Sequence, residues 1–153
     1  MGASIDDLQV LRVAEALADD VWKQVAGWSD FSRDTVGKQL TRAVDSIGAN
    51  ISESFGRYHY GEKVQFLYCA QGSVFETKYW LNRVHKRKLM PESEVLNQIE
   101  RIGHLARLLN GFLTYIKQSR KIHTSSDGKP FVKTLLFMPL TSSNLTSYLL
   151  QRI

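Results

Sequence analysis

The sequence predicts an all-α protein, an up-down-up-down antiparallel four-helix bundle with a C-terminal extension. Long segments carry apolar residues at spacings of three and four, which is the period of a helix with one buried face. Short joints separate these segments, so that consecutive helices become antiparallel neighbours. The 153 residues are 43% hydrophobic and 23% charged, as in a globular domain with room for a core. We expect the bundle to occupy residues 1–121 and the extension to occupy residues 122–153.

The first helix is predicted from about Ile5 to Trp28. Its apolar residues recur at three- and four-residue spacing throughout that range. Ser4 is suited to cap the helix, and Asp6 and Asp7 favour its first turn because carboxylates interact well with a helix N-terminus.

The second and third helices are predicted from Arg33 or Thr35 to Phe55 and from Gly61 or Glu62 to Lys88. Gly48 and Gly72 lie near their middles, where glycine costs roughly 1 kcal/mol relative to alanine. Such glycines indicate close approach of a neighbouring helix. Cys69, the only cysteine, is interpreted as an ordinary buried thiol on the core face of the third helix.

The fourth helix is predicted from Pro91 to about Lys121, with the proline in its first turn. Turn-forming residues follow at 124–130, and then comes an apolar run at 131–138 that ends before Pro139. This run reads as a short strand or as an apolar segment laid on the bundle, on a neighbouring subunit or on a partner.

The second helix carries an apolar stripe beside a polar one. The apolar stripe comprises Leu40, Ala43, Val44, Ile47, Ile51 and Phe55. The polar stripe comprises Arg42, Ser46, Asn50, Glu53 and Arg57. Serine and asparagine are poor helix formers with short reach, so this stripe indicates either a polar seam between helices or a recognition surface.

Charge is unevenly distributed along the chain. The net charge is +5, the first twenty residues are acidic, and the stretch from Lys78 to Lys133 is strongly basic. Opposite charges can attract within the bundle or between subunits, and a basic face can hold a polyanion. No apolar run reaches the ~20 residues of a membrane span, and no secretory signal is recognisable, so we expect a cytoplasmic protein.

Basic side chains cluster at the ends of the third and fourth helices. The candidate nucleic-acid-binding residues are Lys86, Arg87, Lys88, Lys117, Arg120, Lys121 and Arg57. Cations at helix C-termini also suit the helix dipole, so solvated helix ends are the alternative interpretation. Tyr58 and Tyr60 are suited either to stack on exposed bases or to pack between helices.

Catalysis finds no support in the sequence. The paired Glu-x-x-His motifs of di-iron bundles are missing, as are nucleophile-elbow, phosphate-loop and zinc-protease motifs. We therefore expect no enzymatic activity, no catalytic residues, no metal site and no cofactor.

Two groups of residues resemble the paired motifs of the bacterial proteins encoded by intervening sequences of 23S ribosomal RNA genes. They are Gln39-Leu40-Thr41-Arg42-Ala43, Ser46-Ile47, Ala49-Asn50-Ile51, Glu53 and Gly56-Arg57, followed by Phe66-Leu67, Ala70, Gly72-Ser73 and Glu76. The resemblance covers roughly residues 5–121. Where this chain has Gly48 and Ser54, the family usually has proline and glycine.

The resemblance implies a small bundle that assembles into a ring, commonly a pentamer. A related branch serves reverse transcriptases of diversity-generating retroelements as an accessory protein, with basic surface toward nucleic acid. We expect a polar network of Arg42, Ser46, Asn50, Glu53, Arg57, Ser73 and Glu76 between the second and third helices. In it, Glu53 or Glu76 accepts from an arginine and from Asn50 or Ser73.

Two functions follow as hypotheses. The first is a non-enzymatic homo-oligomeric scaffold that binds RNA, DNA or a nucleoprotein through its basic surface. The alternative is a protein-protein adaptor, for example to a reverse transcriptase, that does not bind nucleic acid by itself.

Overall fold

A computed structural model of the chain describes residues 8–124, with side chains through Arg120, and this part is entirely helical. The elements are α1 (Gln9–Ala26), a single turn α2 (Asp30–Ser32), a π-helical turn η2 (Arg33–Gly37), α3 (Lys38–Gly56), α4 (Tyr60–Lys86) and α5 (Glu92–Thr124). The predicted all-α class and four-helix architecture are confirmed. The expected cap at Ser4 lies outside the described residues, as do residues 125–153 of the predicted extension, whereas residues 122–124 still belong to α5.

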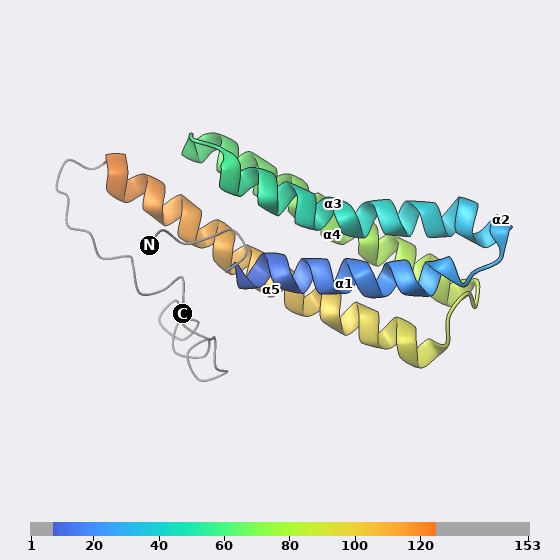
Figure 1. The fold of residues 1–153 in the computed structure, drawn as a ribbon. Helices are drawn as coiled ribbons and strands as arrows, with labels where there is room; N and C mark the ends of the chain where they lie inside the picture. Colours follow the sequence, from blue (N-terminus) through green and yellow to red (C-terminus); the bar gives the residue numbers. More distant parts are fainter. Residues whose placement is uncertain (1–7, 125–153) are drawn as a thin grey trace.

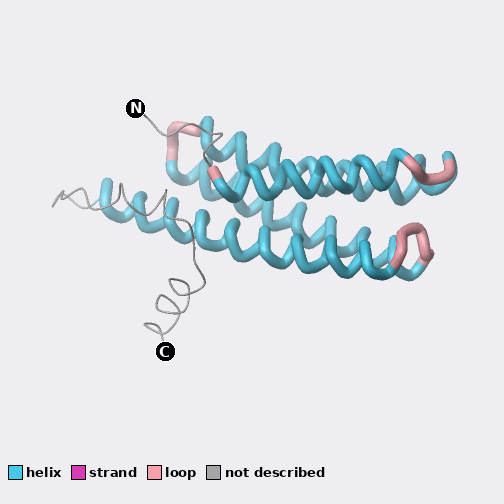
Figure 2. Tube along the Cα trace, turned by 60° about the horizontal axis from the view of Figure 1, so that its bottom comes forward, coloured by secondary structure: helices cyan, strands magenta, loops and turns pink. Residues whose placement is uncertain are grey.

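The four long helices run up, down, up and down, as Figure 1 shows. Each of α1 and α4 packs against both α3 and α5, so α1 and α4 occupy diagonal corners. The α1–α2 and α4–α5 connections lie at one end of the bundle, and the α3–α4 turn lies at the other. Loops are confined to these ends (Figure 2), so the sides of the described bundle are formed by helix faces alone.

The core is a column of aliphatic side chains contributed by all four helices. Fully buried examples are Leu17, Val21, Leu40, Val44, Ile47, Ile51, Leu67, Leu81, Leu105 and Leu109. Burying one such side chain contributes roughly 1.5–3 kcal/mol. The apolar stripe predicted on the second helix faces this core, except that Phe55 is exposed.

The second long helical segment begins earlier than the predicted Arg33 or Thr35. Its backbone is helical from Asp30 to Gly56, and the wide π turn of η2 is inserted before α3. Gly37 ends this turn against α1. A Cβ atom added at Gly37 would lie 2.6 Å from Cγ1 of Val25, so this glycine marks the tightest helix contact among the glycines described.

Gly48 and Gly72, which were predicted to mark close helix contacts, do not do so. At Gly48 an added Cβ would make ordinary contacts with Leu11 and Ala14 of α1, at 3.7 and 3.9 Å. At Gly72 an added Cβ would meet nothing within 4 Å, so the predicted close packing there is wrong within the single chain. The physical reason is orientation, because Gly72 lies on the outer side of α4.

Cys69 lies on that outer side too, and the prediction of a buried thiol is wrong. Leu67 and Ala70 are fully buried, whereas Phe66 is only half-buried. The rest of the buried face of α4 follows the predicted spacing and comprises Ala70, Ser73, Val74, Thr77, Leu81 and Val84. Spacing alone could not exclude Phe66 and Cys69 from that face, because α4 has apolar residues on more than one side.

Polar contacts tie the described helices together at three places. The side-chain amide of Gln71 in α4 donates a hydrogen bond to the side-chain oxygen of Asn110 in α5. Arg101 of α5 donates a 2.7 Å hydrogen bond to Asp20 of α1, which confirms the expected attraction between the acidic first helix and a later basic one. At the α3–α4 turn, the Ser54 hydroxyl donates to the Lys63 carbonyl at 3.0 Å, and the Lys63 ammonium donates to the Phe55 carbonyl at 3.1 Å. Desolvation lowers the pKa of Lys63 from its ordinary value.

Candidate nucleic-acid interface

Lys86, Arg87 and Lys88 lie together and exposed where α4 ends. Two hydrogen bonds close this end: the Leu89 amide donates to the Val84 carbonyl, and the Lys88 amide donates to the His85 carbonyl, both at 3.1 Å. This is the Schellman pattern, in which the residue after the cap adopts a left-handed conformation and is usually glycine. Here that residue is Lys88, with φ of 55°.

A lysine in the left-handed region costs the fold roughly 1 kcal/mol. It is the only non-glycine residue of the described chain with positive φ. Strained residues of this kind concentrate at functional sites. The strain at Lys88 therefore singles out this turn from the other helix ends.

The cluster is also electrostatically unsatisfied. Within residues 8–120, ion pairs engage other cations, namely Lys23 and Arg101 with Asp20, Arg33 with Asp30, and Arg57 with Glu53. Over the same residues no carboxylate pairs with Lys86, Arg87 or Lys88. Their three charges are therefore available to an external anion.

The remaining predicted basic residues lie at the opposite end, near the α3–α4 turn and the end of α5. The Lys117 ammonium lies 4.9 Å from the centroid of the Tyr68 ring, and the Arg57 guanidinium lies 4.6 Å from that of Phe66. Arg120 is exposed. Lys121 belongs to α5, but its side chain lies outside the described part. Arg57 is the weaker candidate because Glu53 pairs with it.

Two tyrosines at this end differ in environment. Tyr60 packs against the core, whereas Tyr58 is 88% exposed, with its ring centroid 5.2 Å from that of His59. The single chain therefore does not use Tyr58 for helix packing.

The polar network expected between the second and third helices is not formed by the predicted residues. The Ser46 hydroxyl donates to the Arg42 carbonyl and the Asn50 amide donates to the Ser46 carbonyl, both at 2.7 Å. The Ser73 hydroxyl donates to the Cys69 carbonyl at 3.1 Å. Only the Glu53–Arg57 pair occurs as predicted, and it too stays within one segment.

The physical reason is reach. Short side chains on a helix find a backbone carbonyl four residues earlier before they find a neighbouring helix. Glu76 is exposed, and so is Arg42. Among the described residues the polar stripe therefore lies on the surface, and its side chains are satisfied along their own helix. The polar contact between α3 and α4 is made instead by Ser54 and Lys63, which the sequence did not single out.

Sequence reasoning also missed the outer face of α4. Tyr68, Phe75 and Tyr79 are 45%, 74% and 53% exposed. Their spacing of seven and four places them on one side of the helix, and that spacing was the signal available in the sequence. Arg83 approaches the ring of Tyr79, with its guanidinium carbon 5.4 Å from the ring centroid.

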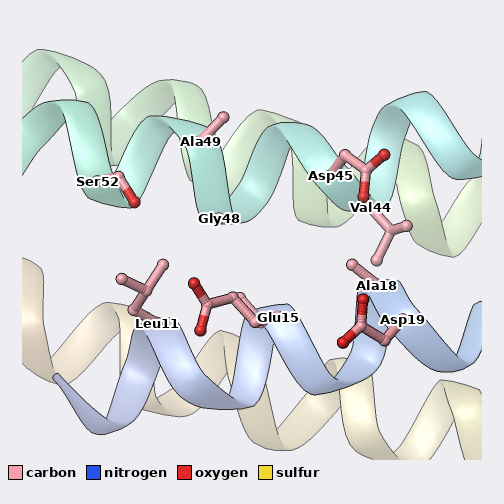
Figure 3. A pocket seen from close by; sticks show the side chains of 10 residues that line it. Leu11, Glu15, Ala18, Asp19, Val44, Asp45, Gly48, Ala49 and Ser52 are labelled. Atoms are coloured by element: carbon pink, nitrogen blue, oxygen red, sulfur yellow. The ribbon is translucent and has the colours of Figure 1, made fainter. Parts of the chain in front are cut away.

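A shallow groove between α1 and α3 is the other surface feature. It has a volume of about 230 Å³, and Figure 3 shows the carboxylates of Glu15, Asp19 and Asp45 around it. Small residues also line it, including Ala14, Ala18, Gly48 and Ala49. Among residues 8–120, no three His, Cys, Asp or Glu side chains are grouped so as to hold a metal ion.

Partial desolvation beside this groove, and secondarily the charge of Asp19, raise the pKa of the exposed Asp45 above its ordinary value of 3.8. A raised pKa in the folded state means that ionised Asp45 disfavours folding at pH values above that pKa, and that this penalty fades as the pH falls. Asp45→Asn is therefore expected to raise the thermal midpoint of dilute protein at pH 7, with no gain below pH 3.8. Melting curves across this pH range measure the effect.

Asp19→Asn provides the matched control, because it removes the charge that faces Asp45. In that background Asp45→Asn should gain less than it does alone, since contacting residues are not additive. A gain from Asp45→Asn that is equally large at all pH values would contradict the electrostatic explanation.

None of the helices in the described part of the chain is long and apolar enough to cross a membrane.

Comparison with known proteins gives a similar solved structure and a matching family. A solved structure with a similar fold is that of a protein of unknown function from the S23 ribosomal protein family of Bacteroides thetaiotaomicron. It is 20% identical, has a TM-score of 0.64, and the alignment covers 72% of this chain and 99% of that one. No curated protein matches significantly. The model of the 23S rRNA-intervening sequence protein family matches residues 6–111. Because this match spans most of the chain and includes both motif groups, the chain belongs to the 23S rRNA-intervening sequence protein family.

Proposed function

We propose that this protein is a non-enzymatic, homo-oligomeric scaffold that binds nucleic acid or a nucleoprotein through phosphate contacts. The observation that carries the proposal is the strained turn of Lys86, Arg87 and Lys88, three exposed cations that no carboxylate neutralises within the described residues. Phosphates are strong partners for such cations. Lys117 and Arg120 at the other end supply a second basic cluster.

Assembly strengthens such weak sites. One turn with three cations binds a polyanion modestly, but several copies on one ring act together, because linked contacts add. The exposed aromatic side chains of α4 support assembly, since a monomer rarely leaves so many large apolar groups in water. A cytoplasmic location fits this function.

The alternative is an adaptor that contacts a protein and has no affinity of its own for nucleic acid. Exposed Trp22, Phe31 and Phe75 favour protein contact. The resemblance to accessory proteins of diversity-generating retroelements makes a reverse transcriptase the partner to test in that case.

A salt titration separates the two functions. We expect binding to a generic RNA or DNA oligonucleotide at about 50 mM salt, with the logarithm of the association constant falling linearly against the logarithm of salt concentration. Three phosphate contacts predict a slope of about −2 to −3, and engagement of more subunits predicts a steeper one. The absence of binding at low salt would contradict the scaffold function and favour the adaptor.

A further inference from the structure

The outer face of α4 is an apolar surface without a partner among the described residues. We call Tyr68, Phe75 and Tyr79 the aromatic face. Gly72 lies among these residues, and nothing lies within 4 Å of a Cβ atom placed there. A helix with large rings around a glycine leaves a depression that a second helix can enter closely. This face is therefore shaped for helix packing.

The charge along the aromatic face is mainly positive. The Lys117 ammonium covers the ring of Tyr68, and the Arg83 guanidinium approaches the ring of Tyr79. Lys86 follows seven residues after Tyr79 and so continues the same side of the helix. Glu76 is the acidic residue at its edge. Nε of Arg83 is buried and has no acceptor in the described residues.

The groove between α1 and α3 has the opposite character. It is lined by three carboxylates, those of Glu15, Asp19 and Asp45, together with small residues such as Ala18 and Ala49 (Figure 3). Trp22 is 64% exposed and lies one turn beyond Asp19 on α1. A partner that brought cations into this groove would relieve the repulsion between Asp19 and Asp45.

The two surfaces match in length. Tyr79 lies eleven positions after Tyr68, and Trp22 lies eleven positions after Leu11, which in both cases is about 17 Å of helix. They cannot meet within one chain, because α1 and α4 occupy diagonal corners of the bundle. Two different complementary surfaces on one molecule make a head-to-tail contact, which closes into a ring when the rotation between copies permits.

We propose that the aromatic face of α4 docks into the acidic groove between α1 and α3 of a second copy of this chain. The aromatic rings supply the apolar contact, and the cations beside them meet Glu15, Asp19 and Asp45. This pairing rests on the assembly stated under the proposed function and assigns its surfaces. Single-stranded nucleic acid, which also stacks on aromatic rings, is the competing occupant.

The experiment uses two variants of the full chain, each with one altered surface. Phe75→Ser with Tyr79→Ser removes the aromatic face, and Glu15→Lys with Asp45→Lys reverses the groove. All four side chains are exposed, so circular dichroism should show unchanged helicity. Light scattering after size exclusion should find the wild type assembled and each variant alone at the monomer mass of 17.5 kDa.

Mixing the two variants is the decisive step. A head-to-tail interface leaves one intact face and one intact groove in the mixture, so an equimolar mixture should form a dimer that grows no further. Phe31→Ser with Leu96→Ser is the matched control, because it removes exposed apolar side chains outside both surfaces and should leave assembly intact.

Other outcomes overturn the pairing in distinguishable ways. If the groove variant assembles alone, the aromatic faces pair with each other. If the aromatic-face variant stays assembled and loses affinity for a single-stranded RNA oligonucleotide, nucleic acid occupies that face. If the wild type is monomeric at every concentration, the scaffold itself is refuted and the pairing with it.

Discussion

Arg87→Gln with Lys88→Gly is expected to weaken RNA or DNA binding by about two orders of magnitude at about 0.1 M salt. At that concentration, release of the counterion at each phosphate contact is worth roughly tenfold in affinity. The salt slope should fall by about 2 for each copy of the turn that contacts phosphate. Fluorescence anisotropy with a labelled oligonucleotide over a range of salt concentrations measures both quantities.

Stability should change in the opposite direction. Glycine relieves the left-handed strain of Lys88, so the free energy of unfolding should rise by about 1 kcal/mol. A loss of binding in a more stable protein cannot be attributed to unfolding. This opposition makes the double variant more informative than neutralising the cluster with alanines.

The matched control is Lys23→Gln with Arg33→Gln. It removes two cations from the same end of the bundle, but these already pair with Asp20 and Asp30. Their replacement should weaken binding much less. Equal losses in the two double variants would mean that binding follows net charge alone, and the assignment to the turn after α4 would be wrong.

Gly37→Ala is expected to lower the free energy of unfolding by about 1–3 kcal/mol, because a methyl group there overlaps a packed helix contact. The added carbon would lie 2.6 Å from Val25, and 3.4 Å from both Trp28 and the Ser32 carbonyl. Neither the branched valine nor the indole ring can move away without disturbing the joint between α1 and α3. Chemical denaturation of dilute protein measures the change.

Alanine at Gly48 or Gly72 should have the opposite effect and raise stability by roughly 0.5–1 kcal/mol, as in an unobstructed helix. Contacts at Gly48 are ordinary ones, and those at Gly72 are absent within the described chain. Gly111→Ala, also in open space on α5, is the reference for helix propensity alone. Destabilisation by Gly72→Ala in dilute monomer would contradict the orientation of α4 described above.

The basic cluster shows how far sequence reasoning reached at the site. Consecutive Lys86, Arg87 and Lys88 at a helix end were sufficient to nominate it, because a run of like charges at a C-terminus needs no tertiary information. The strain at Lys88 and the lack of nearby carboxylates came from the structure. Three of the four ion pairs between described residues are local in sequence, whereas the pair of Asp20 with Arg101 joins helices far apart in sequence.

The polar stripe shows where such reasoning fails. Arg42, Ser46 and Asn50 share one side of a helix, and the sequence determined that much. It did not determine whether that side meets another helix, since the same residues satisfy a buried seam or a solvated surface. The structure places this side of α3 on the surface, where the Ser46 hydroxyl and the Asn50 amide donate hydrogen bonds to carbonyls of their own helix.

The sequence by itself determined the number of helices, their order and their approximate bounds, because the three- and four-residue period, the proline and glycine punctuation and the short joints are local. Only the tertiary structure decided which apolar residues of α4 lie outside its buried side, namely Cys69, Phe75 and Tyr79. It also decided that Gly37, and not Gly72, marks the close contact. Rotation of a helix about its axis is set by the summed packing of all its neighbours, and a helix with apolar residues on several sides leaves that rotation undetermined until those neighbours are in place.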